Sequence, residues 1–317
     1  MKPRPILIIG PPRSGTTLLA TMINAHPRIF VANEAKVLTS LLPGSTVFDA
    51  SLSRETVAAI LRDLEDNELA SYAPLPDAAA VLQAAERPSI PAVIGALFET
   101  LAAREGKPRW GEKTAVAYRR LDAIRAAFPD ALLIGMDRDP MQIAASYQKT
   151  IPKWGAFGGL INWLDYHRAI ARQDAAFRMH VVSYAQLTSA PEEALRRVCA
   201  FIGEEFDTAM LEFHSTGRAA SLQGKPEFAG VSRRLFTPVP PDPRLARGFR
   251  GRLGKMLIAA ARSPKQPPGI QERALRGCLF VRAALWEAVQ PQFRSRLLRR
   301  LRRWRLDAAT GGAGLVP

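Results

Sequence analysis

The residues best suited to chemistry form a short loop near the start of the chain. Gly10-Pro-Pro-Arg-Ser-Gly15-Thr16-Thr17 has the G-x-x-x-x-G spacing of a nucleotide phosphate loop and directly follows an apolar run. In such a loop, backbone N–H groups and the N-terminus of the next helix face an anion. An ordinary strand-to-helix turn is the alternative, but the strand and helix patterns on either side favour the phosphate loop.

The loop lacks a cation that NTP-binding sites use. The lysine that reaches the β- and γ-phosphates would stand at position 16, where Thr16 is found, and Arg13 supplies the cation within the loop. Such a site suits ATP with magnesium poorly. It could still hold a 5′-phosphosulfate, whose terminal sulfuryl group carries less charge. The loop therefore argues against an NTPase, and a small-molecule P-loop kinase using ATP and Mg²⁺ is kept as the alternative enzyme.

A second polar pair follows a later apolar run. Arg138 follows the run 131–136, and Ser146 lies two turns into the next helical pattern. Together they could clamp a phosphate, the guanidinium giving paired donors and the hydroxyl a third. The alternative for the arginine, in Arg138-Asp139, is a structural salt bridge or helix cap.

Two further charged residues could act on a reacting group. Glu34 follows the short run 29–31 and could return to the same rim as a general base, or it could be a helix-capping or surface residue. Lys113, in Trp110-Gly-Glu-Lys113, is predicted to lie in a turn ahead of a helix and could neutralise developing charge. His26 and His167 are kept as reserve bases.

The loop Pro12-Arg-Ser-Gly-Thr-Thr-Leu-Leu19 resembles the 5′-phosphosulfate loop of sulfotransferases that use 3′-phosphoadenosine-5′-phosphosulfate (PAPS). The continuation Asn24-Ala-His-Pro27 is similar to their tyrosylprotein branch and its bacterial relatives. The resemblance implies that PAPS is the donor, that adenosine 3′,5′-bisphosphate is the product and that no metal is needed. It also implies that the 5′-phosphosulfate is bound by Arg13, Ser14, Gly15, Thr16 and Thr17.

The same resemblance gives roles to the other polar residues. Arg138 and Ser146 would hold the 3′-phosphate, which distinguishes PAPS from ATP. Glu34 would be the base, while Lys113 and Arg13 would stabilise the leaving oxygen. Lys36 replaces a substrate-contacting arginine of the tyrosylprotein branch, and lysine cannot reproduce the arginine's bidentate fork. Ser232 is aligned with a late serine that contacts the nucleotide.

In-line transfer to a hydroxyl acceptor follows from these roles. The acceptor could be a small molecule, a lipid, a carbohydrate or a peptide. A non-catalytic nucleotide-binding, membrane-associated module is the alternative outside enzymes, and the presence of Glu34 argues against it.

Strand patterns at 5–9, 29–31, 131–136 and 180–183 alternate with helical ones, including 116–128 and 158–177. This alternation predicts an α/β fold with a P-loop-type, doubly wound parallel sheet flanked by helices, whose ligands bind at the carboxyl ends of the strands. We expect one sulfotransferase domain over 1–270, with a helical insertion at about 50–105, and a basic helical C-terminal extension over 271–317.

The C-terminal extension carries much of the net charge of +15, with seven arginines between Arg294 and Arg305. Within 292–306, apolar residues at spacings of three and four form one stripe. A helix docked on the body, a contact with an anionic membrane surface and a nucleic-acid arm are all consistent with this pattern. Nucleic acid is the least favoured, and the membrane interpretation suggests a lipid or lipid-linked acceptor.

The overall composition is that of a globular protein, with 47% hydrophobic and 23% charged residues, which argues against disorder of the whole chain. The two cysteines predict neither a disulfide framework nor a metal cluster. No apolar run reaches the length of a membrane span, and the first ten residues already read as a strand rather than a signal peptide. We therefore expect a cytoplasmic protein, with peripheral membrane association through 292–306 left open.

Overall fold

A computed structural model describes residues 4–35, 37–41, 52–65, 75–85, 89–173 and 178–216, together with 273 and 276–278. In these residues five strands form one sheet in the order β2-β3-β1-β4-β5, and each neighbouring pair is parallel. The strands are β1 (Ile6–Ile9), β2 (Ile29–Asn33), β3 (Arg109–Lys113), β4 (Leu132–Asp137) and β5 (Met179–Ser183). The predicted parallel α/β fold is confirmed.

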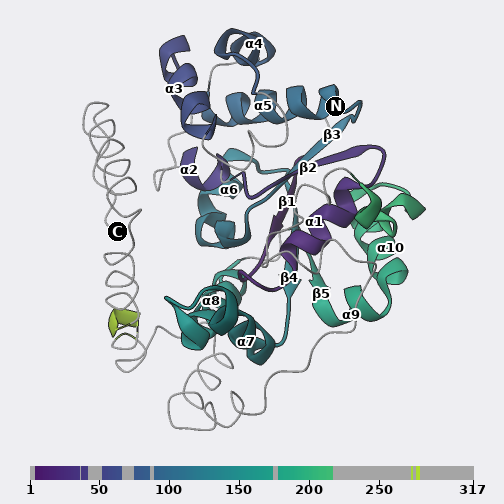
Figure 1. Cartoon of the computed structure of the whole chain (residues 1–317). Helices are drawn as coiled ribbons and strands as arrows, with labels where there is room; N and C mark the ends of the chain where they lie inside the picture. The colour runs from purple at the N-terminus through teal and green to yellow at the C-terminus, as the bar shows by residue number, and fades with distance from the viewer. Residues whose placement is uncertain are drawn as a thin grey trace.

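Helices cover both faces of the sheet (Figure 1). One face packs on α1 (Thr16–Asn24), α9 (Tyr184–Ser189) and α10 (Pro191–Ile202). The other face packs on α2 (Val37–Leu41), α3 (Arg54–Glu65), α4 (Ala78–Ala84), α5 (Ile90–Arg104), the 3₁₀-helix η2 (Ala115–Arg120) and α6 (Leu121–Ala127). The helices α7 (Pro140–Thr150) and α8 (Gly155–Ala171) pack together beside the end of β4. Two 3₁₀-helices, η3 (Thr208–Met210) and η4 (Phe213–Ser215), follow α10.

The central strand β1 explains this layering. Successive side chains of a strand point to opposite faces. Ile6 and Ile8 therefore join the core beneath α1, whereas Leu7 and Ile9 join the core beneath α5. All four are at most 1% exposed, so the strand needs helices on both sides.

The sequence prediction for the segment around Lys113 was wrong. Arg109–Lys113 is not a turn but strand β3, paired with β2 on one side and β1 on the other. Its polar side chains, Arg109, Glu112 and Lys113, are all buried, so the apolar run that signals a central strand is missing.

Other predicted boundaries shift, and part of the predicted extension can be located. The segment predicted as one helix over 116–128 is η2 followed by α6, and the helix predicted over 158–177 is α8, Gly155–Ala171. The predicted insertion contains α3, α4 and α5. Arg276 belongs to the predicted extension and is one of the described residues. It forms an ion pair with Asp165 of α8, in which Nη2 of the arginine lies 2.6 Å from Oδ1 of the aspartate. The segment 292–306 lies outside the described residues.

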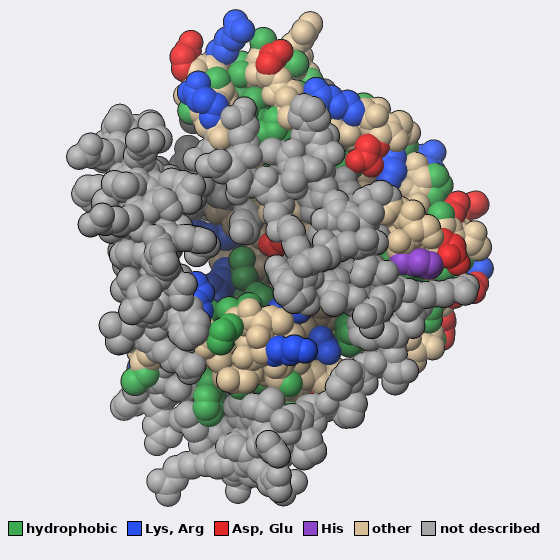
Figure 2. All heavy atoms as spheres, viewed as in Figure 1, with side chains coloured by type: hydrophobic (Ala, Val, Ile, Leu, Met, Phe, Trp, Pro, Cys, Tyr) green, Lys and Arg blue, Asp and Glu red, His purple; other side chains and the backbone are tan. Residues whose placement is uncertain are grey.

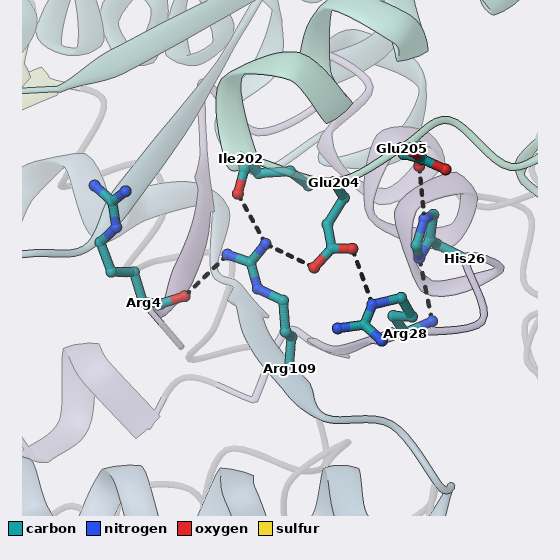
Figure 3. A network of polar contacts seen from close by, with 7 residues as sticks. All are labelled: Arg4, His26, Arg28, Arg109, Ile202, Glu204 and Glu205. Atoms are coloured by element: carbon teal, nitrogen blue, oxygen red, sulfur yellow. Dashed lines mark hydrogen bonds and ion pairs between the residues drawn. The ribbon is translucent and has the colours of Figure 1, made fainter. Parts of the chain in front are cut away.

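A polar network lies at the amino-terminal ends of the strands (Figure 3). Arg109, the first residue of β3, places Nη1 3.1 Å from Glu204, and the same carboxylate accepts a hydrogen bond from Arg28 at 3.0 Å. His26 accepts the Arg28 amide at Nδ1, 3.1 Å away, and its Nε2 lies 2.9 Å from the carbonyl of Glu205. Both ring nitrogens of His26 are thus used in structural contacts at this edge, whereas the phosphate loop follows the other end of β1.

Candidate functional site

The predicted phosphate loop connects β1 to α1 and is held by its own backbone. The amide of Ser14 donates to the carbonyl of Pro11 at 3.0 Å, and Gly15 takes the left-handed position that starts α1, with φ of 106°. A Cβ atom at Gly15 would meet the ring of Tyr184 at 2.5 Å. Glycine is therefore required both for the positive φ and for the space beside this ring. The Ser14 side chain is fully buried, and its hydroxyl has no hydrogen-bond partner among the described residues. A buried donor without a partner in this loop fits an anionic ligand.

The second polar pair lies against this loop. Arg13 donates from Nε to the hydroxyl of Ser146 on α7, 3.0 Å away. Arg138, which follows β4, donates from Nη1 to the carbonyl of Arg13 at 2.9 Å and from Nε to Gln142 at 2.9 Å. The structure thus brings the loop after β1 into contact with the segment that follows β4.

Tyr184 is a member of this group that the sequence analysis missed. The guanidinium carbon of Arg138 lies 4.0 Å from the centre of its ring. Burial raises the pKa of Tyr184 and lowers that of Arg138, because both groups sit away from water. Tyr184 follows β5 directly, and this position at the carboxyl edge of the sheet is the one signal that could have indicated it.

A lysine links the phosphate loop to the predicted base. Lys113 ends β3, its side chain is 1% exposed, and its Nζ lies 2.9 Å from the hydroxyl of Thr17 and 2.6 Å from Oε1 of Glu34. Glu34 follows β2, is 23% exposed, and donates its amide to the carbonyl of Lys113 at 2.6 Å. The carboxylate therefore reaches solvent while one oxygen stays in contact with a buried ammonium group.

Backbone strain marks the same residues. Within the described part of the chain, Arg13 and Glu34 are the non-glycine residues with positive φ, at 72° and 51°. Left-handed backbone costs an ordinary residue about 1–2 kcal/mol. Strain of this kind persists where the surroundings enforce it and is concentrated at functional sites.

The local charge favours an anion. Arg13, Lys113 and Arg138 lie at the carboxyl edge of the sheet with the carboxylates of Glu34 and Asp139, so the positive charges outnumber the negative ones. Figure 2 shows Lys and Arg side chains gathered around a recess in this face of the molecule. Within the described ranges, no group of three His, Cys, Asp or Glu side chains could hold a metal ion.

Some predicted residues cannot be placed. Lys36 and Ser232 lie outside the described residues. The reserve base His167 lies on α8, with Nε2 3.3 Å from Oδ1 of Asp137 and its ring centre 4.3 Å from that of Trp163. It therefore has structural partners of its own.

The parallel sheet and the phosphate loop after its first strand define a P-loop-like α/β fold. Residues 5–208 match the profile of the Sulfotransferase family. The chain belongs to this family. None of the described helices is long and apolar enough to cross a bilayer.

Three curated proteins are similar to parts of the chain. The chain is 26% identical over 230 residues to a protein of Aquifex aeolicus, covering 68% of this chain and 27% of that protein. It is 26% identical over 246 residues to the nodulation protein NoeE of Sinorhizobium fredii, covering 67% and 53%. A putative protein-tyrosine sulfotransferase of Caenorhabditis briggsae is 24% identical over 221 residues, covering 66% and 69%. The chain thus spans about a quarter and about half of the first two relatives.

Two solved structures share the fold. The sulfotransferase domain from the curacin biosynthetic pathway superposes with a TM-score of 0.50 at 17% identity, covering 84% of this chain and 99% of that one. The sulfotransferase domain of the Synechococcus PCC 7002 olefin synthase gives a TM-score of 0.50 at 24% identity, covering 79% and 98%. At these identities the likeness concerns the fold.

Proposed function

We propose that the chain transfers the sulfuryl group of PAPS to a hydroxyl acceptor, with Glu34 as the general base. The observation that carries the proposal is the position of Lys113, whose Nζ touches both the phosphate loop at Thr17 and the carboxylate of Glu34. One buried cation thus joins the place for the donor's 5′ end to the group that would activate the acceptor.

The proposed transfer is a single in-line displacement. Glu34 takes the proton of the acceptor hydroxyl as its oxygen bonds to sulfur, and the bond from sulfur to the bridging oxygen of the phosphate breaks. Arg13 and Lys113 stabilise the negative charge that appears on the departing phosphate. Lys113 has three N–H donors, so it can contact that oxygen while keeping Thr17. Ser14, Gly15, Thr16 and Thr17 would hold the 5′-phosphate through the loop and the start of α1.

The 3′-phosphate would be bound beside this loop by Arg138 and Ser146. Both residues already contact Arg13, one through its carbonyl and one through its side chain. A ligand with phosphates on both sides of one ribose could therefore reach both groups of donors. ATP has no 3′-phosphate and would leave the half-buried guanidinium of Arg138 without a ligand anion. Ser232 would be a further nucleotide contact and Lys36 an acceptor contact.

A binding measurement tests the donor. Calorimetry should show adenosine 3′,5′-bisphosphate binding at least about 10²-fold more tightly than ATP, with or without Mg²⁺, because only the bisphosphate offers a charged partner to Arg138. Tighter binding of ATP with Mg²⁺ would instead support the small-molecule kinase.

A transfer experiment tests the reaction. The protein is incubated with labelled PAPS and a cell extract, and mass spectrometry searches for a product heavier by one sulfuryl group. The label should move to a hydroxyl compound, and added EDTA should not reduce the yield. Absence of transfer to any acceptor, with the bisphosphate still bound, would support the non-catalytic module.

The proposed location is the cytoplasm, where residues 292–306 would bind the surface of an anionic membrane. Binding of this kind would bring a lipid-linked acceptor to the site. Flotation with anionic and neutral liposomes tests it. Binding to the anionic vesicles should be lost when 291–317 is deleted, and retention of binding would reject the role of this segment.

A further inference from the structure

Glu112 is a buried acid that the proposed mechanism does not use. It precedes Lys113 on β3 and is 1% exposed. Because neighbouring strand residues point to opposite faces, Glu112 faces α2 whereas Lys113 faces α1. One strand end therefore presents an ammonium group to the site and a carboxylate to the layer behind it.

The carboxylate of Glu112 has three hydrogen-bond donors around it. Oε1 accepts the amide of Val37 at 3.0 Å and the hydroxyl of Thr114 at 2.7 Å, and Oε2 accepts the amide of Leu38 at 3.3 Å. Val37 and Leu38 begin α2, and the first amides of a helix have no partner within it. The start of α2 is thus bound by a side chain from another strand.

The end of β3 consequently binds Glu34 on one side and Val37 and Leu38 on the other. The carbonyl of Lys113 accepts the amide of Glu34 at 2.6 Å, and the carboxylate of Glu112 holds the amides of Val37 and Leu38. Between these attachments, Glu34 takes its left-handed conformation with φ of 51°. An ordinary residue stays in that conformation where its surroundings enforce it.

We infer that Glu112 is a positioning residue, which anchors the start of α2 and thereby keeps the carboxylate of Glu34 against Lys113. This inference rests on the proposed role of Glu34 as the base. Glu112 is enclosed behind the strand and does not itself touch the reacting atoms.

The hydrogen-bond pattern requires acceptor oxygens at both positions of the side chain. Two carboxylate oxygens can accept all three donors at once, whereas the amide of glutamine has one acceptor oxygen and two N–H donors. In a Glu112→Gln variant the amide nitrogen would therefore face a backbone N–H or the hydroxyl of Thr114. Burial raises the pKa of Glu112 to about 7, whereas the hydrogen bonds from Thr114, Leu38 and Val37 lower it because they favour the charged form.

Glu112→Gln should lower kcat by about 10²-fold, because displacement of a reacting group by about 1 Å has an effect of this size. The Kd for adenosine 3′,5′-bisphosphate should change by less than about twofold, because the phosphate loop lies on the other face of the strand. Hydrogen exchange at the amides of Val37 and Leu38 should become faster. Glu112→Asp keeps the charge and should recover part of the loss in kcat.

The matched control is Glu204→Gln. Glu204 is also a largely buried carboxylate that binds charged donors, Arg109 and Arg28, but at the opposite edge of the sheet (Figure 3). It should lower the Tm and leave kcat unchanged. Equal kcat values for Glu112→Gln and Glu204→Gln would overturn the inference, as would unchanged exchange at Val37 and Leu38.

A variant that does not fold and a wild-type protein that transfers no sulfuryl group lead to different conclusions. If Glu112→Gln does not fold, Glu112→Asp carries the test, and wild-type kcat with wild-type amide exchange in that variant would overturn the inference. If the wild-type protein transfers no sulfuryl group from PAPS, the proposed function fails, while the exchange measurement still decides whether Glu112 anchors α2.

Discussion

Arg13 and Ser146 are 133 positions apart in the chain, and Nε of the arginine lies 3.0 Å from the hydroxyl of the serine. The contact joins the loop after β1 to helix α7 after β4. Together with the bond from Arg138 to the carbonyl of Arg13, it makes one continuous group of donors from two loops.

Glu34→Gln keeps the shape of the proposed base and removes its ability to accept a proton. Loss of a general base lowers rates by about 10²–10⁴-fold, so kcat should fall by this factor. Affinity for adenosine 3′,5′-bisphosphate should not fall, because Glu34 lies outside the phosphate loop. Steady-state assays with PAPS and calorimetry measure the two quantities, and undiminished kcat would remove Glu34 from the mechanism.

Arg138→Ala should abolish the distinction between a 3′-phosphorylated nucleotide and one without this group. Affinity for adenosine 3′,5′-bisphosphate should fall by about 10–10²-fold, the effect of losing hydrogen bonds to a charged group. Affinity for AMP should change little. Arg197→Ala is the control, because Arg197 pairs with Glu193 on the surface of α10. Equal losses for both nucleotides in Arg138→Ala would contradict the assignment of Arg138 to the 3′-phosphate.

Gly15→Ala and Gly203→Ala separate backbone strain from crowding. Both glycines have positive φ, 106° and 77°, so alanine costs about 1–2 kcal/mol at either position. A Cβ at Gly203 meets nothing within 4 Å, whereas at Gly15 it meets the ring of Tyr184 at 2.5 Å. Gly15→Ala should therefore lower the Tm further and also weaken nucleotide binding. Equal effects in thermal unfolding, with nucleotide affinity unchanged, would show that the contact with Tyr184 is unimportant.

The buried carboxyl of Glu112 predicts a pH effect on stability. Its pKa is raised from 4.5 to about 7 by burial, and the nearby charge of Glu34 acts in the same direction. Between these values the folded protein holds a proton that the unfolded chain has released, so this contribution to stability is lost as the pH rises. Wild type should lose on the order of 3 kcal/mol relative to Glu112→Gln between about pH 4.5 and 8. Urea unfolding at several pH values measures this, and parallel curves for the two proteins would contradict it.

The sequence predicts the fold through its most apolar strands. The runs at β1 and β4 are buried on both faces, and this pattern can be read without a structure. Strand β3 could not be recognised in this way, because its buried Arg109, Glu112 and Lys113 are satisfied by partners distant in the sequence. Polar residues in a central strand look like a turn until those partners are known.

The candidate site also has one part that the sequence predicts and another that it does not. The phosphate loop is local, so its spacing predicts its geometry, including the need for glycine at position 15. Lys113 ends β3 and contacts Thr17 in α1, and Arg138 follows β4 and contacts Tyr184 in α9. Both contacts join segments that follow different strands, so they depend on the strand order. The spacing of residues along the chain carries no information on that order, and this is why Tyr184 and Glu112 were missed.

The strand order also constrains how the protein is made. The central strand β1 is synthesised first, yet its two neighbours, β3 and β4, begin only at Arg109 and Leu132. During translation its four apolar residues therefore remain unpaired until β3 and β4 have been synthesised. Parallel pairing between strands so far apart in the sequence is also slow. The nascent chain therefore exposes the apolar strand β1 until β3 and β4 have been made, and we expect chaperones that shield emerging chains to raise the yield of folded protein.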